Sequence, residues 1–163
     1  MTEVLIIHAS KYGSVEEVAR YVAALLRHEG ATCDLVAARD AVDLEGYDLV
    51  VLGTGLYMGR PHRDARRFLR DHHAALAHQP FAVFGLGPLS NEPAEKDKVR
   101  PQLERVLERY PELEPVAVEI FGGVVNHEKL SFPFNHMPEG DHRDWDEIRS
   151  FALSLPIRSL ATA

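Results

Sequence analysis

The sequence has a single cysteine, no apolar run of transmembrane length and no excess of basic residues. Because Cys33 is alone, no intrachain disulfide is expected, which fits a protein of the reducing cytoplasm. A membrane helix needs about 20 consecutive apolar residues, and the N-terminus lacks the basic start and apolar region of a signal peptide, so we expect no stable membrane anchor. With 18 Lys and Arg against 25 Asp and Glu, the net charge of −7 argues against binding to nucleic acid or anionic lipid.

Two common phosphate-binding motifs are also missing: G-x-G-x-x-G of the dinucleotide-binding folds, and G-x-x-x-x-G-K-S/T of the nucleoside triphosphatases. In their place, Ser10-Lys11-Tyr12-Gly13-Ser14 stands between an apolar segment at 4–9, an expected buried strand, and an amphipathic segment at 15–29, an expected helix. Such a loop leaves backbone N–H groups free at the positive end of a helix dipole. It therefore predicts a phosphate site, although Ser and Gly also make ordinary turns and N-caps.

Glycine-rich loops follow two further apolar strands. The strand at 47–52 runs into Gly53-Thr54-Gly55-Leu56-Tyr57-Met58-Gly59, and the strand at 80–84 runs into Gly85-Leu86-Gly87-Pro88-Leu89. Glycines after strands let the backbone approach a ligand closely. In an open doubly wound sheet the ligand lies outside the carboxyl ends of the strands, so we expect the three loops to converge on one ligand.

The rest of the chain alternates strands and helices. We expect strands at 32–37 and 116–121, helices at 63–73, 94–110 and 145–155, a linker at 41–44 too short for a full helix, and, after Gly122-Gly123, an irregular stretch to Arg143. Asp144 with Glu147 predicts a capping box for the last helix. The alternation predicts an α/β fold, a doubly wound five-stranded parallel sheet of order 2-1-3-4-5 in a three-layer α/β/α arrangement. Residues 1–163 are expected to form one domain with a frayed tail at 157–163.

These features resemble the flavodoxin-like proteins, and among them the flavodoxin-domain proteins related to menaquinone-dependent protoporphyrinogen dehydrogenase. The loop at 10–14 is similar to the family's FMN phosphate loop. Residues 47–69, YDLVVLGTGLYMGRPHRDARRFL, resemble its third strand, flavin loop and following helix, and residues 138–145, PEGDHRDW, resemble a recurrent ending of the group. The resemblance covers essentially the whole chain and implies a flavodoxin-like fold that binds FMN.

The resemblance implies three sets of FMN contacts. The first loop would hold the phosphate through the backbone of Ser10, Lys11, Tyr12, Gly13, Ser14 and Val15. The second would flank the isoalloxazine ring, with Tyr57 as stacking partner, through Thr54, Gly55, Leu56, Tyr57, Met58 and Gly59. The third would contact the pyrimidine edge through main-chain groups of Gly85, Leu86, Gly87, Pro88 and Leu89. The sequence identifies no catalytic acid, base or nucleophile, and no metal ligand.

The phosphate loop departs from the family pattern at two positions. Val15 stands where the family has Thr, and one lost hydrogen bond to a charged phosphate costs about 1.5–3 kcal/mol, or roughly 10- to 150-fold in affinity. Tyr12 is bulky where Thr or Asp is common, and it would alternatively cover the ribityl chain. Weaker FMN binding is therefore expected, and a flavodoxin-like scaffold that has lost its flavin stays open as an alternative.

The leading prediction is a redox protein that uses FMN to pass electrons to or from a redox partner protein or a small-molecule electron acceptor such as a quinone. Whether it is an enzyme, which would then be an FMN-dependent oxidoreductase, stays open. The alternatives are a protein-interaction module on a flavin-free scaffold and a protoporphyrinogen-oxidising enzyme of heme biosynthesis. A receiver domain is disfavoured, because Gly53-Thr54 stands where a phosphorylatable Asp would be needed.

Three further clusters leave alternatives. One combines histidines with acids and fits a solvated helix face better than a metal site; its members are His62, His72, His73, His78, Asp64 and Asp71. A basic stripe would either pair with nearby acids or dock an acidic redox partner or a substrate carboxylate; it consists of Arg63, Arg66, Arg67 and Arg70. The apolar stretch at 130–137 is expected to pack over the edge of the core, or to form a pocket wall or a homodimer contact.

Overall fold

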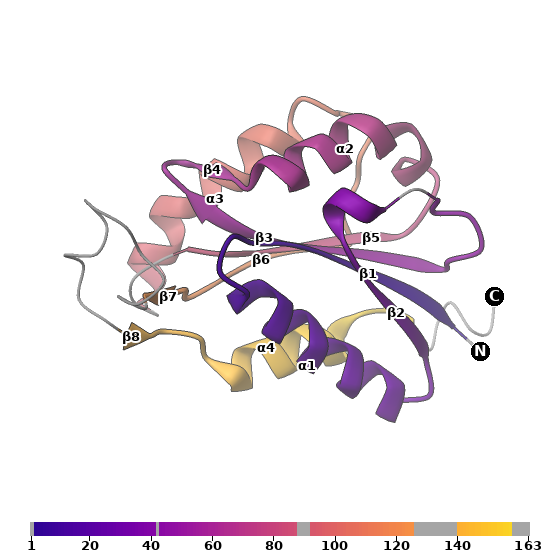
Figure 1. Ribbon diagram of the computed structural model, residues 1–163, viewed down its shortest axis with the longest axis horizontal. Helices are drawn as coiled ribbons and strands as arrows, with labels where there is room; N and C mark the ends of the chain where they lie inside the picture. Colours follow the sequence, from indigo (N-terminus) through magenta and orange to yellow (C-terminus); the bar gives the residue numbers. More distant parts are fainter. Residues whose placement is uncertain (1, 42, 88–91, 126–139, 158–163) are drawn as a thin grey trace.

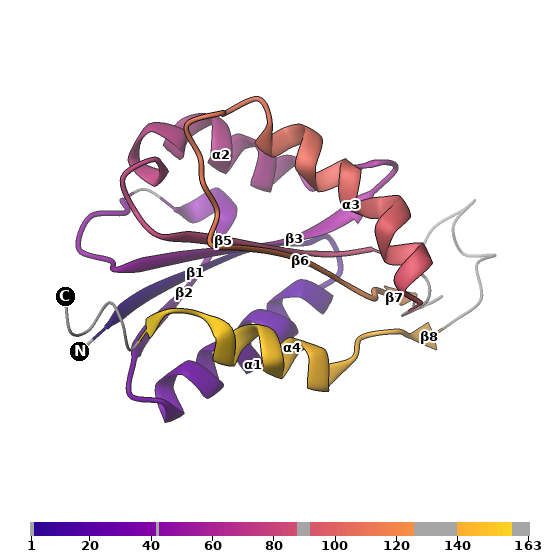
Figure 2. The same cartoon turned by 180° about the vertical axis from the view of Figure 1, so that it is seen from behind.

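The computed structural model describes residues 2–41, 43–87, 92–125 and 140–157. Its strands are β1 (Glu3–Ala9), β2 (Thr32–Ala37), β3 (Leu49–Tyr57), β4 (Arg60–Pro61), β5 (Phe81–Leu86), β6 (Ala117–Phe121), β7 (Val124–Val125) and β8 (Gly140–Asp141). Its helices are α1 (Ser14–His28), the 3₁₀ turn η1 (Ala38–Asp40), α2 (Arg63–Leu76), α3 (Pro93–Leu107) and α4 (Trp145–Ser154). Figures 1 and 2 show three layers, with α1 and α4 on one face of the sheet and α2 and α3 on the other.

The five long strands lie in the order β2-β1-β3-β5-β6, and every pair of neighbours among them is parallel. Counted without the two-residue β4, this is the predicted order 2-1-3-4-5, so the predicted doubly wound fold is confirmed. β4 turns back antiparallel onto β3. None of the helices described is long and apolar enough to span a bilayer.

Both faces of the sheet are apolar because helices cover both. Along β1, Val4 and Ile6 lie in the core cluster beneath α1 and α4, whereas Leu5 and Ile7 lie in the cluster beneath α2. Successive side chains of a strand point to opposite faces. A strand buried on both faces therefore reads as a continuous apolar run, which is why the sequence alone indicates β1.

α1 forms because its apolar residues recur at helical spacing. Val15, Val18, Val22 and Leu26 are all fully buried against the sheet, while the remaining positions carry mainly charged side chains. The helix ends before Gly30, whose φ of +99° lies in the left-handed region that favours glycine.

The second predicted loop is mostly strand. β3 continues through residues 54–57, and only Met58 and Gly59 form the turn into β4. Both turn residues have positive φ, 52° and 85°, as a two-residue type I′ hairpin requires. β5 likewise extends through Gly85 and Leu86. The expectation that residues 53–57, 85 and 86 lie in loops is therefore wrong.

The loop after β2 and the region after β6 also carry more detail than the sequence indicates. The expected short linker is preceded only by the single turn η1, so no full helix forms between β2 and β3. Within the stretch expected to be irregular, β7 and β8 form a short antiparallel pair. The apolar stretch at 130–137 lies outside the described residues.

Hydrogen bonds fix the start of α4 and the segment that follows it. As predicted, the Asp144 carboxylate caps the helix, accepting the N–H groups of Asp146 at 3.0 Å and Glu147 at 3.2 Å. Beyond the helix, Ile157 is buried, and its carbonyl accepts a hydrogen bond from the Thr2 hydroxyl. Ile157, the first residue of the expected frayed tail, is thus anchored, whereas 158–163 lie outside the described residues.

Candidate functional site

The three predicted segments meet at the carboxyl ends of three adjacent strands. In the sheet register Ala9 of β1 is level with Thr54 of β3, and Thr54 is level with Gly85 of β5. From β1 the chain connects to β2, which lies on one side of β1 in the sheet. β3 lies on the other side of β1, so the direction of the strand order switches between β1 and β3. Open α/β sheets bind ligands at such a switch point. Pro88 and Leu89 of the third segment lie outside the described residues.

Between β1 and α1 the backbone turns at Gly13 directly into the first turn of the helix. Gly13 is the N-cap of α1, with φ +85°, and among the described residues no side-chain hydrogen bond caps the helix there. The Gly13 N–H donates to Ser10 Oγ at 3.2 Å, and the Glu17 N–H donates to the Gly13 carbonyl at 3.2 Å. The Glu17 to Gly13 bond is the first of the helix, so the N–H groups of residues 14–16 have no carbonyl partner within α1. They point toward a ligand or solvent at the positive end of the helix dipole.

Val15 faces away from this loop. Its side chain is fully buried in the cluster beneath α1 and α4. Position 15 therefore offers a ligand only its backbone N–H, and the valine contributes apolar packing to the core.

An aromatic cluster of Tyr12, Tyr57 and His62 borders the loop. Tyr57 packs edge-on against Tyr12, with centroids 6.5 Å apart, and against His62 at 6.0 Å. The Lys11 N–H donates to the Tyr57 hydroxyl at 3.2 Å, and burial raises the pKa of this phenol above its ordinary value. The Tyr57 ring folds back over Gly55, where an added Cβ would lie 2.4 Å from the hydroxyl oxygen. Gly55 is thus required by Tyr57 as much as by any ligand.

The other glycines at this edge also make room for side chains. A Cβ on Gly53 would lie 2.2 Å from the Phe84 ring, and one on Gly87 would lie 2.9 Å from Leu56 Cβ. Leu56 is itself buried, as is Leu86. Both leucines therefore face the core, and only their backbone can contact a ligand.

One buried cation near the loop was missed at the sequence level. The Arg143 guanidinium donates to the Ser14 carbonyl at 3.1 Å and, through Nε and Nη2, to the Asp141 carboxylate at 2.9 and 2.7 Å. It also stacks over Trp145, 4.9 Å from the ring centroid. These contacts brace the first turn of α1 against the segment that follows β8. The hydrogen bonds from Arg143 lower the pKa of the Asp141 carboxyl below its ordinary value.

His62 fixes the start of α2 behind the hairpin. The ring Nδ1 of His62 accepts a hydrogen bond from the backbone N–H of Asp64 at 3.0 Å. The backbone N–H of His62 donates to the Gly55 carbonyl at 3.0 Å. Burial lowers the pKa of His62 below 6.5, with neighbouring arginines acting in the same direction and Asp64 opposing them. A neutral ring is needed because Nδ1 must accept a hydrogen bond to cap the helix.

Because the folded-state pKa of His62 is depressed, the unfolded chain binds the proton more readily. The contribution of His62 to the free energy of unfolding is fully present above its unfolded-state pKa of 6.5, and it is lost as the pH falls below that value toward the lower folded-state pKa. We expect His62→Asn, which keeps an N-cap acceptor but does not titrate, to make the loss of stability on acidification shallower in urea denaturation at a series of pH values. The exposed His78→Asn is the control. Equal slopes in both variants would contradict this role of His62.

The histidine and acid cluster on α2 does not assemble a metal site within the residues that the structure describes: no group of three potential ligands comes together there. His73 instead pairs with Glu112 and stacks on Tyr110, and Arg70 pairs with Asp71 at 3.0 Å. These contacts favour the solvated-face interpretation for His73 and Asp71, whereas the side chains of His62 and Asp64 are only 19% and 18% exposed at the start of α2.

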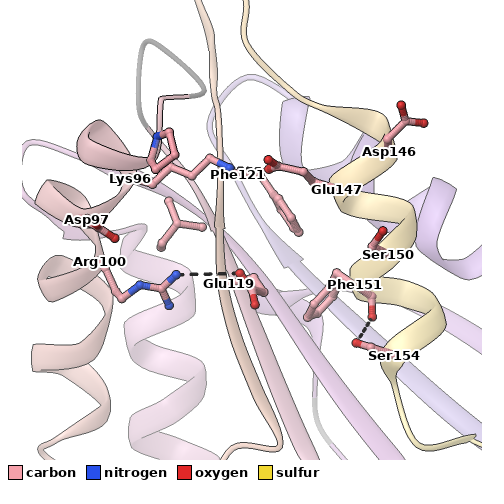
Figure 3. Close-up of a pocket in the computed structure, with 12 residues that line it drawn as sticks. Lys96, Asp97, Arg100, Glu119, Phe121, Asp146, Glu147, Ser150, Phe151 and Ser154 are labelled. Atoms are coloured by element: carbon pink, nitrogen blue, oxygen red, sulfur yellow. Dashed lines mark hydrogen bonds and ion pairs between the residues drawn. The ribbon is translucent and has the colours of Figure 1, made fainter.

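A separate cleft of about 610 Å³ runs along the edge strand β6 between α3 and α4 (Figure 3). The charged groups that line it form ion pairs with one another. Lys96 pairs with Glu147 across the two helices, and Arg100 lies 3.8 Å from Glu119. Arg100 also donates to the Val118 carbonyl at 2.9 Å, on the free edge of the sheet. These contacts stabilise the edge strand β6. The backbone N–H groups that are candidates to bind a ligand lie elsewhere, at the N-terminus of α1 beside the strand ends.

Fold and site together define a flavodoxin-like protein, with a helix N-terminus open to a ligand at the switch point of the sheet. Comparison with known proteins gives the same class: the family model described as Flavodoxin domain matches residues 5–137, and the chain belongs to that family. Membership of this family supports flavin-type electron transfer.

The relatives are distant in sequence. Protoporphyrinogen IX dehydrogenase [quinone] of Escherichia coli strain K12 is 21% identical over 168 residues, covering 93% of each chain. Among solved structures, oxidised flavodoxin 1 from Bacillus cereus superposes with a TM-score of 0.63 at 19% identity, covering 93% of this chain and 95% of that one. Rubredoxin oxygen:oxidoreductase from Desulfovibrio gigas superposes with a TM-score of 0.64 at 17% identity. The superposition covers 98% of this chain but only 36% of that protein.

Proposed function

We propose that this protein binds FMN and transfers electrons between the flavin and a redox partner protein or a small molecule such as a quinone. The observation that carries the proposal is the N-terminus of α1 at Gly13. No side-chain hydrogen bond from the described residues caps it, and it lies beside Tyr57 at the ends of three adjacent strands. When bound, the flavin supplies the redox chemistry, and the protein supplies binding, orientation and electrostatics. We also propose a cytoplasmic location, which the lone buried thiol of Cys33 supports.

The residues present fit an FMN phosphate. Among the described residues, a Cβ on Gly13 would meet no atom within 4 Å, so nothing there crowds this side of the turn. Backbone N–H groups at a helix N-terminus bind phosphate without a charged side chain, and Arg143 holds the first turn of α1 in position. Tyr12 and Tyr57 provide aromatic faces next to this loop. Under the proposal, the loop binds the phosphate and Tyr57 orients the ring by stacking.

Tyr57 must exchange its present hydrogen bond for this role. Its hydroxyl accepts the Lys11 N–H, which is one of the donors expected to bind the phosphate. We expect Tyr57→Phe, which keeps the ring and removes the competing acceptor, to bind FMN as tightly as the unmodified protein or up to about tenfold more tightly. Tyr57→Ala, which removes the ring, should bind more weakly. Titration of each variant with FMN checks this, and a large loss in Tyr57→Phe would contradict it.

Electron transfer is tested on protein reconstituted with FMN. The flavin is reduced anaerobically, and its reoxidation by added quinones is followed through its absorption. Reoxidation that is faster with protein-bound than with free flavin supports the proposal. A protein that retains no FMN contradicts it and favours the flavin-free scaffold.

Oxidation of protoporphyrinogen with a quinone is a second candidate. It is favoured by the similarity to the Escherichia coli dehydrogenase, which extends over 93% of both chains. The fluorescence of the porphyrin product, measured with protoporphyrinogen and a quinone under anaerobic conditions, separates the candidates. No porphyrin above the rate without protein would leave electron transfer alone as the proposed activity.

A further inference from the structure

Four arginines of α2 and one from the segment after α3 line a single cleft of about 250 Å³. The α2 residues are spaced by three and four positions, so they share one face of the helix. Val106 and Tyr110 form the apolar part of the lining, with Val106 buried and Tyr110 half-buried. We call this surface the arginine patch; it comprises Arg63, Arg66, Arg67, Arg70 and Arg109.

The patch has an excess of positive charge on a chain whose net charge is −7. Two of its members have acidic neighbours: Arg70 pairs with Asp71 at 3.0 Å, and Arg63 lies 4.0 Å from Asp64. Within the described residues, no carboxylate lies at ion-pair distance from the other three, Arg66, Arg67 and Arg109. Pairing with local acids therefore accounts for only part of the stripe.

The extent of the patch indicates what it can bind. Arg63 and Arg70 are seven residues apart, which is about 10 Å along a helix, and this exceeds the reach of a single carboxylate or phosphate. Guanidinium groups bind carboxylates through two parallel hydrogen bonds, and the Val106 and Tyr110 surface accepts apolar side chains between them. We propose that the arginine patch docks an acidic segment of a partner protein, with carboxylates on the arginines and apolar side chains on the floor.

The patch begins beside the candidate flavin site. α2 starts directly after the β3–β4 hairpin, and the His62 N–H anchors that start to the Gly55 carbonyl at 3.0 Å. A partner docked on the patch lies next to the turn at Met58, a residue that is 80% exposed. Identifying this partner as an electron donor or acceptor rests on the proposed function. The docking itself does not require the flavin.

The test uses flavin-free protein and a labelled peptide of alternating glutamate and leucine. Fluorescence anisotropy at low ionic strength should show binding that weakens as salt is added, because the Debye length falls from about 30 Å at 0.01 M to about 10 Å at 0.1 M. The double variant Arg67→Glu/Arg109→Glu should bind at least about tenfold more weakly.

A charge-matched control is available on the opposite layer. Arg20 of α1 and Arg149 of α4 are exposed, so Arg20→Glu/Arg149→Glu changes the net charge equally and leaves the patch intact. All four arginines are exposed, and thermal unfolding should show that both double variants fold. The control should bind the peptide within about twofold of the unmodified protein.

Four outcomes would overturn the proposal. They are no peptide binding at low salt, equal weakening in both double variants, tripolyphosphate binding as tightly as the peptide at the same arginines, and concentration-dependent self-association that only the patch variant loses. The third would make the patch a small-anion site, and the fourth would make its partner a second copy of the chain. Because the assay contains no flavin, failure here is distinct from failure to bind FMN.

Discussion

Protein carrying Gly13→Trp is expected to retain no FMN, with an affinity at least about 100-fold below that of the unmodified protein, a loss of about 2.7 kcal/mol. Gly13 has φ +85°, and within the described part of the chain a Cβ built on it would meet no atom within 4 Å. An indole at this position would fill the space in which the phosphate is expected to lie. The left-handed backbone would also cost any L-residue about 1–2 kcal/mol. Flavin absorption after desalting, followed by titration with FMN, measures the loss.

Gly30→Trp separates the loss of the ligand from backbone strain. Gly30 has φ +99° and also nothing within 4 Å, but it follows the C-terminal end of α1. The two substitutions should therefore lower the thermal midpoint by similar amounts, and only Gly13→Trp should lose FMN. Full FMN retention in Gly13→Trp would show that the phosphate binds elsewhere.

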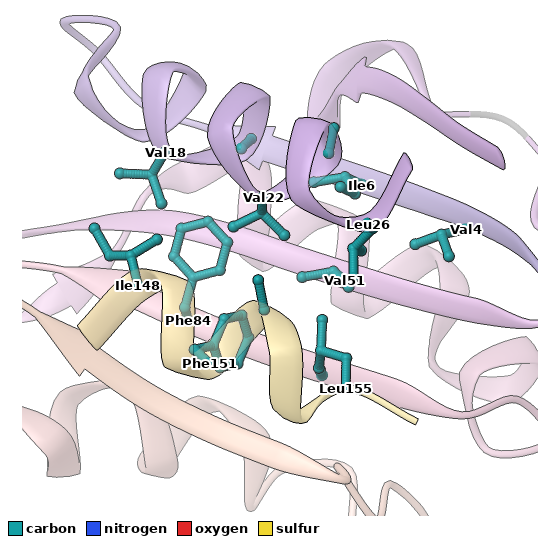
Figure 4. Packing of buried hydrophobic residues seen from close by; sticks show 14 of the residues in the cluster. Val4, Ile6, Val18, Val22, Leu26, Val51, Phe84, Ile148, Phe151 and Leu155 are labelled. Atoms are coloured by element: carbon teal, nitrogen blue, oxygen red, sulfur yellow. The ribbon is translucent and has the colours of Figure 1, made fainter. Parts of the chain in front are cut away.

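Phe151→Ala is expected to lower the free energy of unfolding by about 3–5 kcal/mol, a large share of the roughly 5–15 kcal/mol typical of a native protein. Phe151 of α4 is 4% exposed and packs edge-on against Phe84 of β5 and Phe121 of β6, with centroids 5.8 and 5.7 Å apart. Figure 4 shows Phe151 facing Phe84 beneath the sheet, with Ile148 on the same helix. Truncation leaves a cavity that these rings cannot fill.

Leu153→Ala is the matched control on the same helix. Leu153 is 45% exposed, so its truncation should change stability by no more than about 0.5 kcal/mol. Urea denaturation of both variants measures the difference. Similar losses in the two variants would contradict the orientation of α4 on the sheet.

The order of elements could be predicted from sequence because the patterns that define it are local. The apolar run of β1 and the helical spacing in α1 each indicate an element by themselves. The end of β3 could not be predicted in this way. Gly53 and Gly55 read as loop residues, but they lie in a strand because the rings of Phe84 and Tyr57 occupy the space of their missing side chains. Contacts with Phe84, which lies on another strand, leave no local signal.

The candidate site likewise has features that could be predicted from sequence and others that could not. Its position follows from the rule that parallel strands end at one edge, so the three segments could be brought together in advance. Arg143 could not, because it reaches Ser14 across 129 positions of sequence. The His62 cap could have been suspected from its place directly before the basic helix, but histidine is an uncommon N-cap. The hydrogen bond from Lys11 to the Tyr57 hydroxyl depends on the fold that joins β1 to β3.

Isothermal titration of the flavin-free protein with FMN and with riboflavin, while the flavin absorption is followed, tests the phosphate loop directly. The two ligands differ only in the phosphate, so the difference in affinity measures what the loop contributes. We predict sub-micromolar binding of FMN and at least about tenfold weaker binding of riboflavin, a difference of 1.4 kcal/mol or more. Equal affinities, or no binding of either flavin, would contradict a phosphate site at Gly13 and would favour a scaffold that acts through protein contacts.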